Sequence, residues 1–229
     1  MYQPLLISGL IEHAARYHGD TAVLSKEVDG QMTHTNWRTV SDNSKRLANA
    51  LATLGLKSSE RIATLAWNNR RHLEAWYAIS GSGMVCHTIN PRLFPEQLSY
   101  IINDADDRVL FFDTTFLPLI MAIKEHIKGV EHFICLSDRD DSIVEKLPNV
   151  LFFDELLAEN STDFDWPQFD EATASSLCYT SGTTGNPKGI LYTHRSSVLH
   201  AMALCMPDVS ALSAQDVLLM RGAHLMQLP

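Results

Sequence analysis

Hydroxyl side chains, glycines and one lysine are concentrated in residues 180–189, between two strand-like stretches. The glycines permit positive φ angles and let the backbone approach a ligand closely, so successive N–H groups can face one anion. The hydroxyl groups add donors, and a lysine ammonium suits phosphate as a point charge. We interpret the stretch as a polyphosphate-binding loop. Its candidate ligands are Thr180, Ser181, Gly182, Thr183, Thr184, Gly185 and Lys188.

The spacing of this loop excludes two common phosphate-binding motifs. A Walker A loop has four residues between its glycines and Ser or Thr after its lysine. Here Gly182 and Gly185 are three positions apart, and Lys188 precedes Gly189. The glycine loop of protein kinases does not match either. The remaining alternative is a flexible turn between two strands, which the ordered sequence Pro187-Lys188-Gly189 disfavours.

The complete pattern, Tyr-Thr-Ser-Gly-Thr-Thr-Gly-x-Pro-Lys-Gly over residues 179–189, resembles the phosphate loop of the adenylate-forming superfamily. Residues 67–77, 87–93 and 111–113 are similar to the first sheet-bearing subdomain of medium- and long-chain fatty-acyl-CoA ligases, including the methylmercaptopropionate-CoA ligase branch. This resemblance runs almost continuously from residue 1 to about Asp216. It identifies the superfamily and indicates the branch.

The resemblance implies a reaction in two steps, in which a fatty acid attacks Mg-ATP to form an acyl-adenylate and CoA then displaces AMP. It implies ATP and Mg²⁺ as cofactors, CoA as co-substrate and a carboxylic (fatty) acid as substrate. Thr180 to Lys188 would hold the β- and γ-phosphates, with Thr180 reaching Mg²⁺ and Lys188 neutralising the leaving diphosphate. Such cations and donors matter because both steps concentrate negative charge. No residue of this chain is assigned a catalytic role.

The resemblance stops after residue 219, where the family continues with Pro-Met-Phe-His and Asn-Ala-Trp-Gly but this chain has a different tail ending at Pro229. A one-nucleotide shift of the Met-Arg-Gly codons can spell the Asn-Ala-Trp of the family motif. We therefore expect an N-terminal fragment of a longer enzyme with a frameshifted tail. Sequencing the locus tests this, and an intact gene with no homologous coding sequence downstream would contradict it.

The missing segments, in the family, line the acyl tunnel, hold adenine and ribose, carry an acidic magnesium ligand and include a mobile C-terminal domain with a catalytic lysine. Because adenylation needs all of these groups aligned, we expect the chain alone to be inactive. We expect a first α/β subdomain over residues 1–172, a phosphate-loop segment over 173–216 and an atypical tail over 217–229. A competing hypothesis is a non-catalytic module that binds nucleotide or oligomerises through an unfinished sheet edge; a homodimer is left open.

Alternating helical and strand-like patterns predict the elements that position the loop. Asp29-Gly30 between residues 22–28 and 31–35 indicates a β-hairpin. The segments 137–149 and 160–172 are polar and are expected to be loops. Helices are expected at 4–17, 37–54, 70–80, 95–103 and 116–127, and strands at 61–66, 85–89, 108–112, 132–136, 176–180 and 190–193. This succession predicts the α/β class, with a largely parallel, helix-covered sheet and a small N-terminal β-hairpin.

Composition narrows the function classes. The formal net charge of −9, without a block of like charges, argues against a nucleic-acid or anionic-membrane partner. No signal peptide or transmembrane segment is expected, and we predict a cytoplasmic protein. Cys86, Cys135, Cys178 and Cys205 are expected to be buried reduced thiols. Histidines 72, 87, 194 and 200 are expected to be caps or surface groups, and Arg92 to fix a turn.

Overall fold

The computed structural model of the protein describes residues 3–180 and 186–219. Its main sheet has seven strands in the order β7-β6-β5-β3-β4-β8-β9. All neighbouring strands are parallel except β8 and β9, which are antiparallel. The strands are β3 (Arg61–Leu65), β4 (Val85–Thr88), β5 (Asp107–Phe112), β6 (His132–Cys135), β7 (Leu151–Phe152), β8 (Ala174–Thr180) and β9 (Lys188–Thr193). The prediction of a largely parallel sheet is confirmed.

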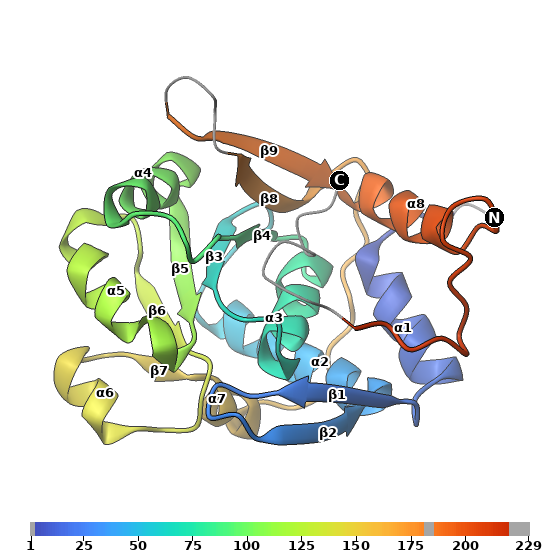
Figure 1. The fold of residues 1–229 in the computed structure, drawn as a ribbon, viewed down its shortest axis with the longest axis horizontal. Helices are drawn as coiled ribbons and strands as arrows, with labels where there is room; N and C mark the ends of the chain where they lie inside the picture. The colour runs from blue at the N-terminus through green and yellow to red at the C-terminus, as the bar shows by residue number, and fades with distance from the viewer. Residues whose placement is uncertain (1–2, 181–185, 220–229) are drawn as a thin grey trace.

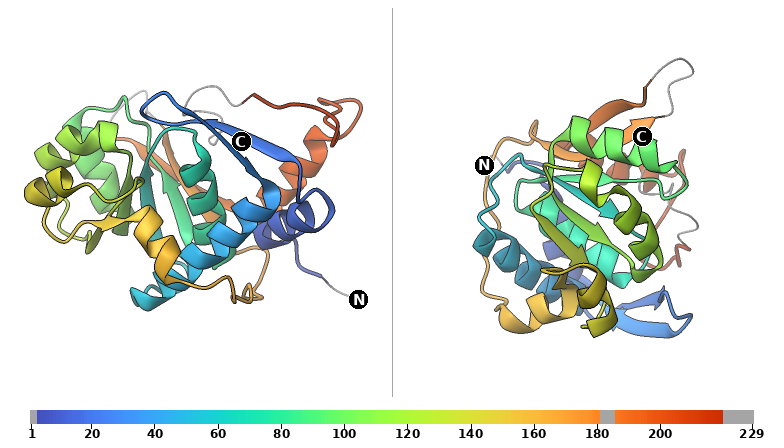
Figure 2. Two further views of the ribbon diagram at one scale, coloured as in Figure 1. Left: turned by 90° about the horizontal axis from the view of Figure 1, so that it is seen from below. Right: turned by 90° about the vertical axis from the view of Figure 1, so that its left-hand side faces the viewer.

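Helices cover both faces of this sheet (Figures 1 and 2). One face carries α1 (Ile7–Tyr17), α2 (Trp37–Thr53), α3 (Arg70–Gly81) and α7 (Phe153–Glu159), and the other carries α4 (Pro95–Ala105) and α5 (Leu117–Ile123). Alternate residues of the central strands enter the two apolar cores: in β3, Ile62 packs on the first face and Ala63 on the second. Such two-sided burial explains why the central strands are almost uniformly apolar.

A small antiparallel hairpin, β1 (Ala22–Lys26) and β2 (Met32–Asn36), lies beside the start of α3. The Ser25 hydroxyl accepts a hydrogen bond from the Arg70 amide at 2.8 Å, and the Glu27 carboxylate lies 3.3 Å from the Arg71 guanidinium. The hairpin predicted around Asp29-Gly30 is therefore present. Gly30 adopts the positive φ of 86° that this turn requires.

Two expectations about the elements were wrong. The segment 137–149, expected to be a loop, contains the short helix α6 (Asp141–Lys146), because the Asp140 side chain accepts a hydrogen bond from the Ser142 amide and caps its start. The single helix expected over 116–127 is instead α5 flanked by two 3₁₀ turns, η1 (Thr114–Phe116) and η2 (Lys124–His126). The helix α8 (His194–Leu204) was not predicted; a capping box at Thr193 and Ser196 begins it.

The connection from α7 to β8, residues 160–173, contains no helix or strand, as expected. It is nevertheless tied to the body of the protein. The Arg46 guanidinium donates to the Asn160 backbone carbonyl at 2.6 Å, and the Asn49 side-chain amide donates to the Ser161 backbone carbonyl at 2.9 Å. Trp166 is buried in the core, against Gly81 of α3. This segment delivers the chain to β8, the strand that leads into the candidate site.

Within residues 3–180 and 186–219, no helix is both long enough and apolar enough to cross a membrane.

Candidate functional site

The two ends of the predicted phosphate loop lie opposite one another. Thr180 is the last residue of β8 and Lys188 the first residue of β9, and the antiparallel register pairs them directly. Both residues are exposed. Ser181, Gly182, Thr183, Thr184 and Gly185, the other predicted ligands, lie outside the described residues. The fold therefore brings one hydroxyl and one cation together where the chain leaves the sheet.

The end of β8 extends beyond its parallel neighbour. Pairing between β4 and β8 involves Ser176 and Leu177 of β8, whereas pairing with β9 continues to Thr180. Tyr179 connects this projecting end to α4, because its hydroxyl donates to the Asp104 carboxylate at 2.7 Å. Burial, followed by the neighbouring Asp104, raises the pKa of Tyr179, so its hydroxyl keeps its proton at neutral pH.

A buried polar pair lies beneath Tyr179. The His87 ring is 5.1 Å from the Tyr179 ring, and His87 Nδ1 is 2.7 Å from Asp107 Oδ2. Both members of the pair are fully buried. Burial raises the pKa of Asp107, and the contact with His87 opposes that rise. Among the described residues, His87 Nε2 and Asp107 Oδ1 have no hydrogen-bond partner.

Three of the four histidines differ from the expectation of caps or surface groups. The His72, His87 and His194 side chains are buried, and each has at least one ring nitrogen in contact with an internal polar group. His72 Nε2 lies 3.0 Å from the Thr64 hydroxyl, and His194 Nδ1 accepts from the Ile7 amide at 3.2 Å. His200 is exposed, as expected.

The other side-chain expectations were partly right. The turn at residues 90–92 is fixed by a hydrogen bond, as expected, in which the Arg92 backbone amide donates to the Asn90 side chain at 3.0 Å. All four cysteines are free thiols, and three are buried. Cys205 is exposed at the C-terminal end of α8.

A second polar cluster follows β3 and β5, and its groups form hydrogen bonds with one another. The Asp113 carboxylate accepts from the Trp67 amide at 2.6 Å and from the Asn69 side chain at 3.2 Å. Burial raises the pKa of Asp113 to about 6, with hydrogen bonds from Trp67 and Asn69 opposing the rise. Because both oxygens of the Asp113 carboxylate are engaged internally, this cluster stabilises the start of α3.

Few of the described side chains are placed where they could bind a metal ion. Among the described residues, no three His, Cys, Asp or Glu side chains are grouped so that they could hold an ion. Mg²⁺ takes oxygen ligands and usually keeps water and substrate phosphates, so a single exposed hydroxyl such as that of Thr180 fits it. Such a site needs the phosphates of a bound nucleotide to be complete.

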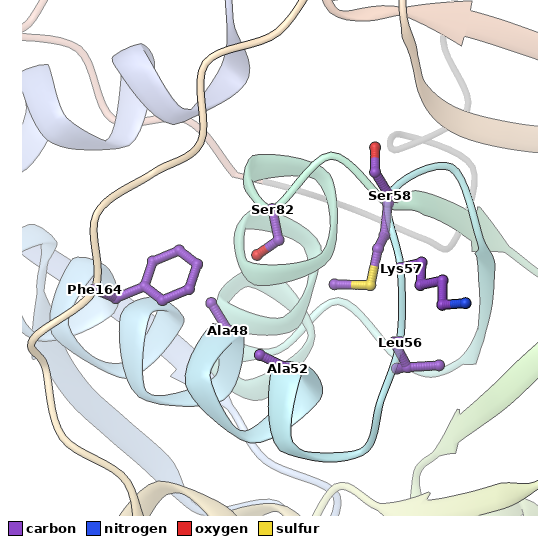
Figure 3. Close-up of a pocket in the computed structure, with 8 residues that line it drawn as sticks. Ala48, Ala52, Leu56, Lys57, Ser58, Ser82 and Phe164 are labelled. Atoms are coloured by element: carbon purple, nitrogen blue, oxygen red, sulfur yellow. The ribbon is translucent and has the colours of Figure 1, made fainter.

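A small cavity lies elsewhere and is not a nucleotide site. Figure 3 shows Phe164, Ala48 and Ser82 on one side of it and Ser58 on the other. Its volume is about 120 Å³, below the roughly 300 Å³ typical of small-molecule pockets. It lies at the amino end of β4, whereas Thr180 ends β8, which runs parallel to β4.

Comparison with known proteins shows which family this chain resembles in sequence and fold. The AMP-binding enzyme family matches residues 10–224. A 3-methylmercaptopropionyl-CoA ligase of Ruegeria lacuscaerulensis is 60% identical over 96% of this chain and 41% of its own length. A medium-chain-fatty-acid CoA ligase of Ectopseudomonas oleovorans is 50% identical over 96% of this chain and 40% of its own length. The chain thus spans about two fifths of the length of these relatives.

Solved structures share the fold. An anthranilate CoA ligase in complex with anthranoyl-AMP superposes with a TM-score of 0.76 at 26% identity, over 87% of this chain and 37% of its own. A long-chain-fatty-acid CoA ligase from Archaeoglobus fulgidus superposes with a TM-score of 0.79 at 22% identity, over 94% and 42% of the two chains, and supports the fold alone. The sequence match over residues 10–224 and the shared helix-covered sheet establish that this chain belongs to the AMP-binding enzyme family.

Proposed function

We propose that this chain supplies the phosphate-binding segment of an ATP-dependent acyl-CoA ligase. The reaction converts a fatty acid, ATP and CoA into acyl-CoA, AMP and diphosphate through an acyl-adenylate. The observation that carries the proposal is the direct pairing of Thr180 with Lys188, both exposed, at the end of the hairpin that bears the family's loop sequence. A cation and a hydroxyl held together can bind an anion without rearrangement of the sheet.

The roles of the individual residues follow from their chemistry. Lys188 neutralises charge on the β- and γ-phosphates, and the Thr180 hydroxyl donates to a phosphate oxygen or binds Mg²⁺. Mg²⁺ at this position neutralises charge on the phosphates when it is bound. Ser181, Gly182, Thr183, Thr184 and Gly185 complete the loop on the strength of their sequence alone. We also propose that the first α/β subdomain ends at residue 172 and that the phosphate-loop segment begins at residue 173.

The substrate class is also proposed. The names of relatives at 60% and 50% identity, a 3-methylmercaptopropionyl-CoA ligase and a medium-chain-fatty-acid CoA ligase, favour an aliphatic carboxylic acid over an amino acid or aryl acid. We place the reaction in the cytoplasm, in agreement with the four free thiols.

Calorimetric titration of the 229-residue chain with ATP and Mg²⁺ tests the proposal. We expect saturable binding that Lys188→Ala abolishes, because the variant removes the only cation of the loop sequence. Lys57→Ala is the matched control, since Lys57 is also exposed but lies before β3, at the amino end of the strands. Absence of saturable binding, or equal affinity of Lys188→Ala and the wild type, would contradict the proposal.

A second candidate function is self-association, and one observation favours it. The strand β9 has a free edge within the described sheet, and Ile190 and Leu191 are 41% and 59% exposed. On α8, Leu199 and Met202 are also exposed, at 43% and 54%. Apolar side chains beside an open strand edge favour pairing with another chain, including a second copy. Oligomers that form without ATP and disappear on Leu191→Lys would support this candidate.

A further inference from the structure

The projecting end of β8 needs support that the sheet does not provide. Among the described residues, β4 pairs with β8 at Cys86 and His87, and the last residues of β8 pair only with β9. The strand β9 is an edge strand in the described sheet. The position of Thr180 and Lys188 relative to the body of the protein therefore depends on side-chain contacts.

Tyr179 makes these contacts in three directions. Its hydroxyl donates to Asp104 Oδ2 at 2.7 Å, and its ring lies 5.1 Å from the ring of His87. Across the hairpin it is paired with Gly189, where an added Cβ would lie only 3.2 Å from Tyr179 Cζ. Because Gly189 has no side chain, the Tyr179 ring packs closely against the backbone next to Lys188, beside Leu177. An aromatic ring over a cross-strand glycine is a recognised way to fix register at a sheet edge.

The partners of Tyr179 are connected through one short segment of the chain. Asp104 lies in the last turn of α4, and Asp107 begins β5 directly afterwards. Asp107 holds His87 through a contact of 2.7 Å between two fully buried side chains. One short segment, residues 104–107, therefore fixes both the hydroxyl of Tyr179 and the ring on which it packs.

We propose that Tyr179 is a positioning residue that fixes Thr180 and Lys188 for phosphate binding. Its contacts with Asp104, His87 and Gly189 hold it in place. The proposal rests on the proposed function of Lys188. It assigns Tyr179 no contact with nucleotide: the residue acts by holding the hairpin end in the geometry that binds it.

The test compares two tyrosines that share one carboxylate. Tyr179→Phe removes the hydroxyl that donates to Asp104 Oδ2, while Tyr100→Phe removes a hydroxyl 3.5 Å from Asp104 Oδ1 on α4 itself. We expect Tyr179→Phe to weaken Mg-ATP binding about tenfold, since a hydrogen bond to a charged group is lost, and Tyr100→Phe to leave the affinity unchanged. The affinities are measured by calorimetry well below the thermal midpoint, where a loss of overall stability alone would not alter them.

Amide hydrogen exchange along β9 is measured in the same variants without nucleotide. We expect faster exchange in Tyr179→Phe and no change in Tyr100→Phe. If the wild type binds Mg-ATP and Lys188→Ala does not, equal affinities of Tyr179→Phe and wild type overturn this inference and leave the proposed function standing. If the wild type does not bind, the proposed function fails, and unchanged exchange in Tyr179→Phe overturns the positioning role independently.

Discussion

The ring of Trp166 lies directly against Gly81, in the last turn of α3, so that a Cβ added at Gly81 would be 2.6 Å from Trp166 Cζ3. Phe164 packs edge-on against the same ring, with centroids 5.1 Å apart. This contact fastens the connection between α7 and β8 to the helix layer. The glycine is required here because any side chain would displace the tryptophan.

Gly81→Ala is therefore expected to destabilise the protein. Forcing one carbon into this contact costs about 1–3 kcal/mol, against the small gain that alanine usually gives in a helix. Gly9→Ala in α1 is the matched control, because a Cβ at Gly9 meets no atom within 4 Å. Urea unfolding of both variants measures the difference. A Gly81→Ala variant as stable as Gly9→Ala would show that Trp166 can move away at no cost.

From the raised pKa of Glu74 we expect the free energy of unfolding to fall as pH rises. The Glu74 side chain is fully buried, 3.0 Å from both Asn43 and Arg70, and burial raises its pKa from 4.5 to about 7 despite the neighbouring Arg70. Between these two values the folded state holds a proton that the unfolded state has released, so the free energy of unfolding decreases as pH rises through this window.

In Glu74→Gln we expect this decrease to be smaller by on the order of 2 kcal/mol, while Glu96→Gln, an exposed first-turn residue of α4, leaves it unchanged. The measurement is urea unfolding at a series of pH values from 4.5 to 7. Parallel profiles for the wild type and Glu74→Gln would mean that Glu74 is ionised at the same pH in both states.

From the lowered pKa of His194 we expect the opposite dependence on pH of the free energy of unfolding. His194 Nδ1 accepts from the Ile7 amide, and burial lowers the pKa of the ring from 6.5 to about 4. The unfolded state therefore takes up a proton first, and stability is lost as pH falls from about 6.5 to about 4. In His194→Asn, whose carbonyl can accept the same bond, the loss should shrink. His72, with a pKa also lowered to about 4 by burial, leaves a residual slope. His200→Asn serves as the exposed control; an equal effect of both substitutions on the profile would rule out this origin.

One thiol should react rapidly in the folded protein. Cys205 is exposed, whereas burial raises the pKa of Cys86, Cys135 and Cys178. Only the thiolate reacts, so these three groups are protected by both access and protonation. Titration with a disulfide reagent should give one fast equivalent, which Cys205→Ser removes. A second fast equivalent in the wild type would indicate opening of the core.

Several parts of the structure followed from local sequence patterns. Helical spacing of apolar residues placed α2 and α3 to within a residue or two, and Asp29-Gly30 located the hairpin. The polar segment that became α6 was missed, because a helix of six residues shows too little periodicity and depends on the cap at Asp140. Helix α8 was missed for a related reason: its apolar residues are not confined to one side, so it lacks a stripe.

The sequence by itself determined which donors and which charge the loop segment carries, because its glycines, hydroxyls and lysine are neighbours along the chain. Only the tertiary structure decided that Thr180 faces Lys188 and that Tyr179 is held by Asp104, 75 positions away in the chain. It also decided that His87 is buried against Asp107 and is not a surface group. Contacts of this kind arise from the strand order, which brings α4 and β5 beside β8, and no local pattern records that order.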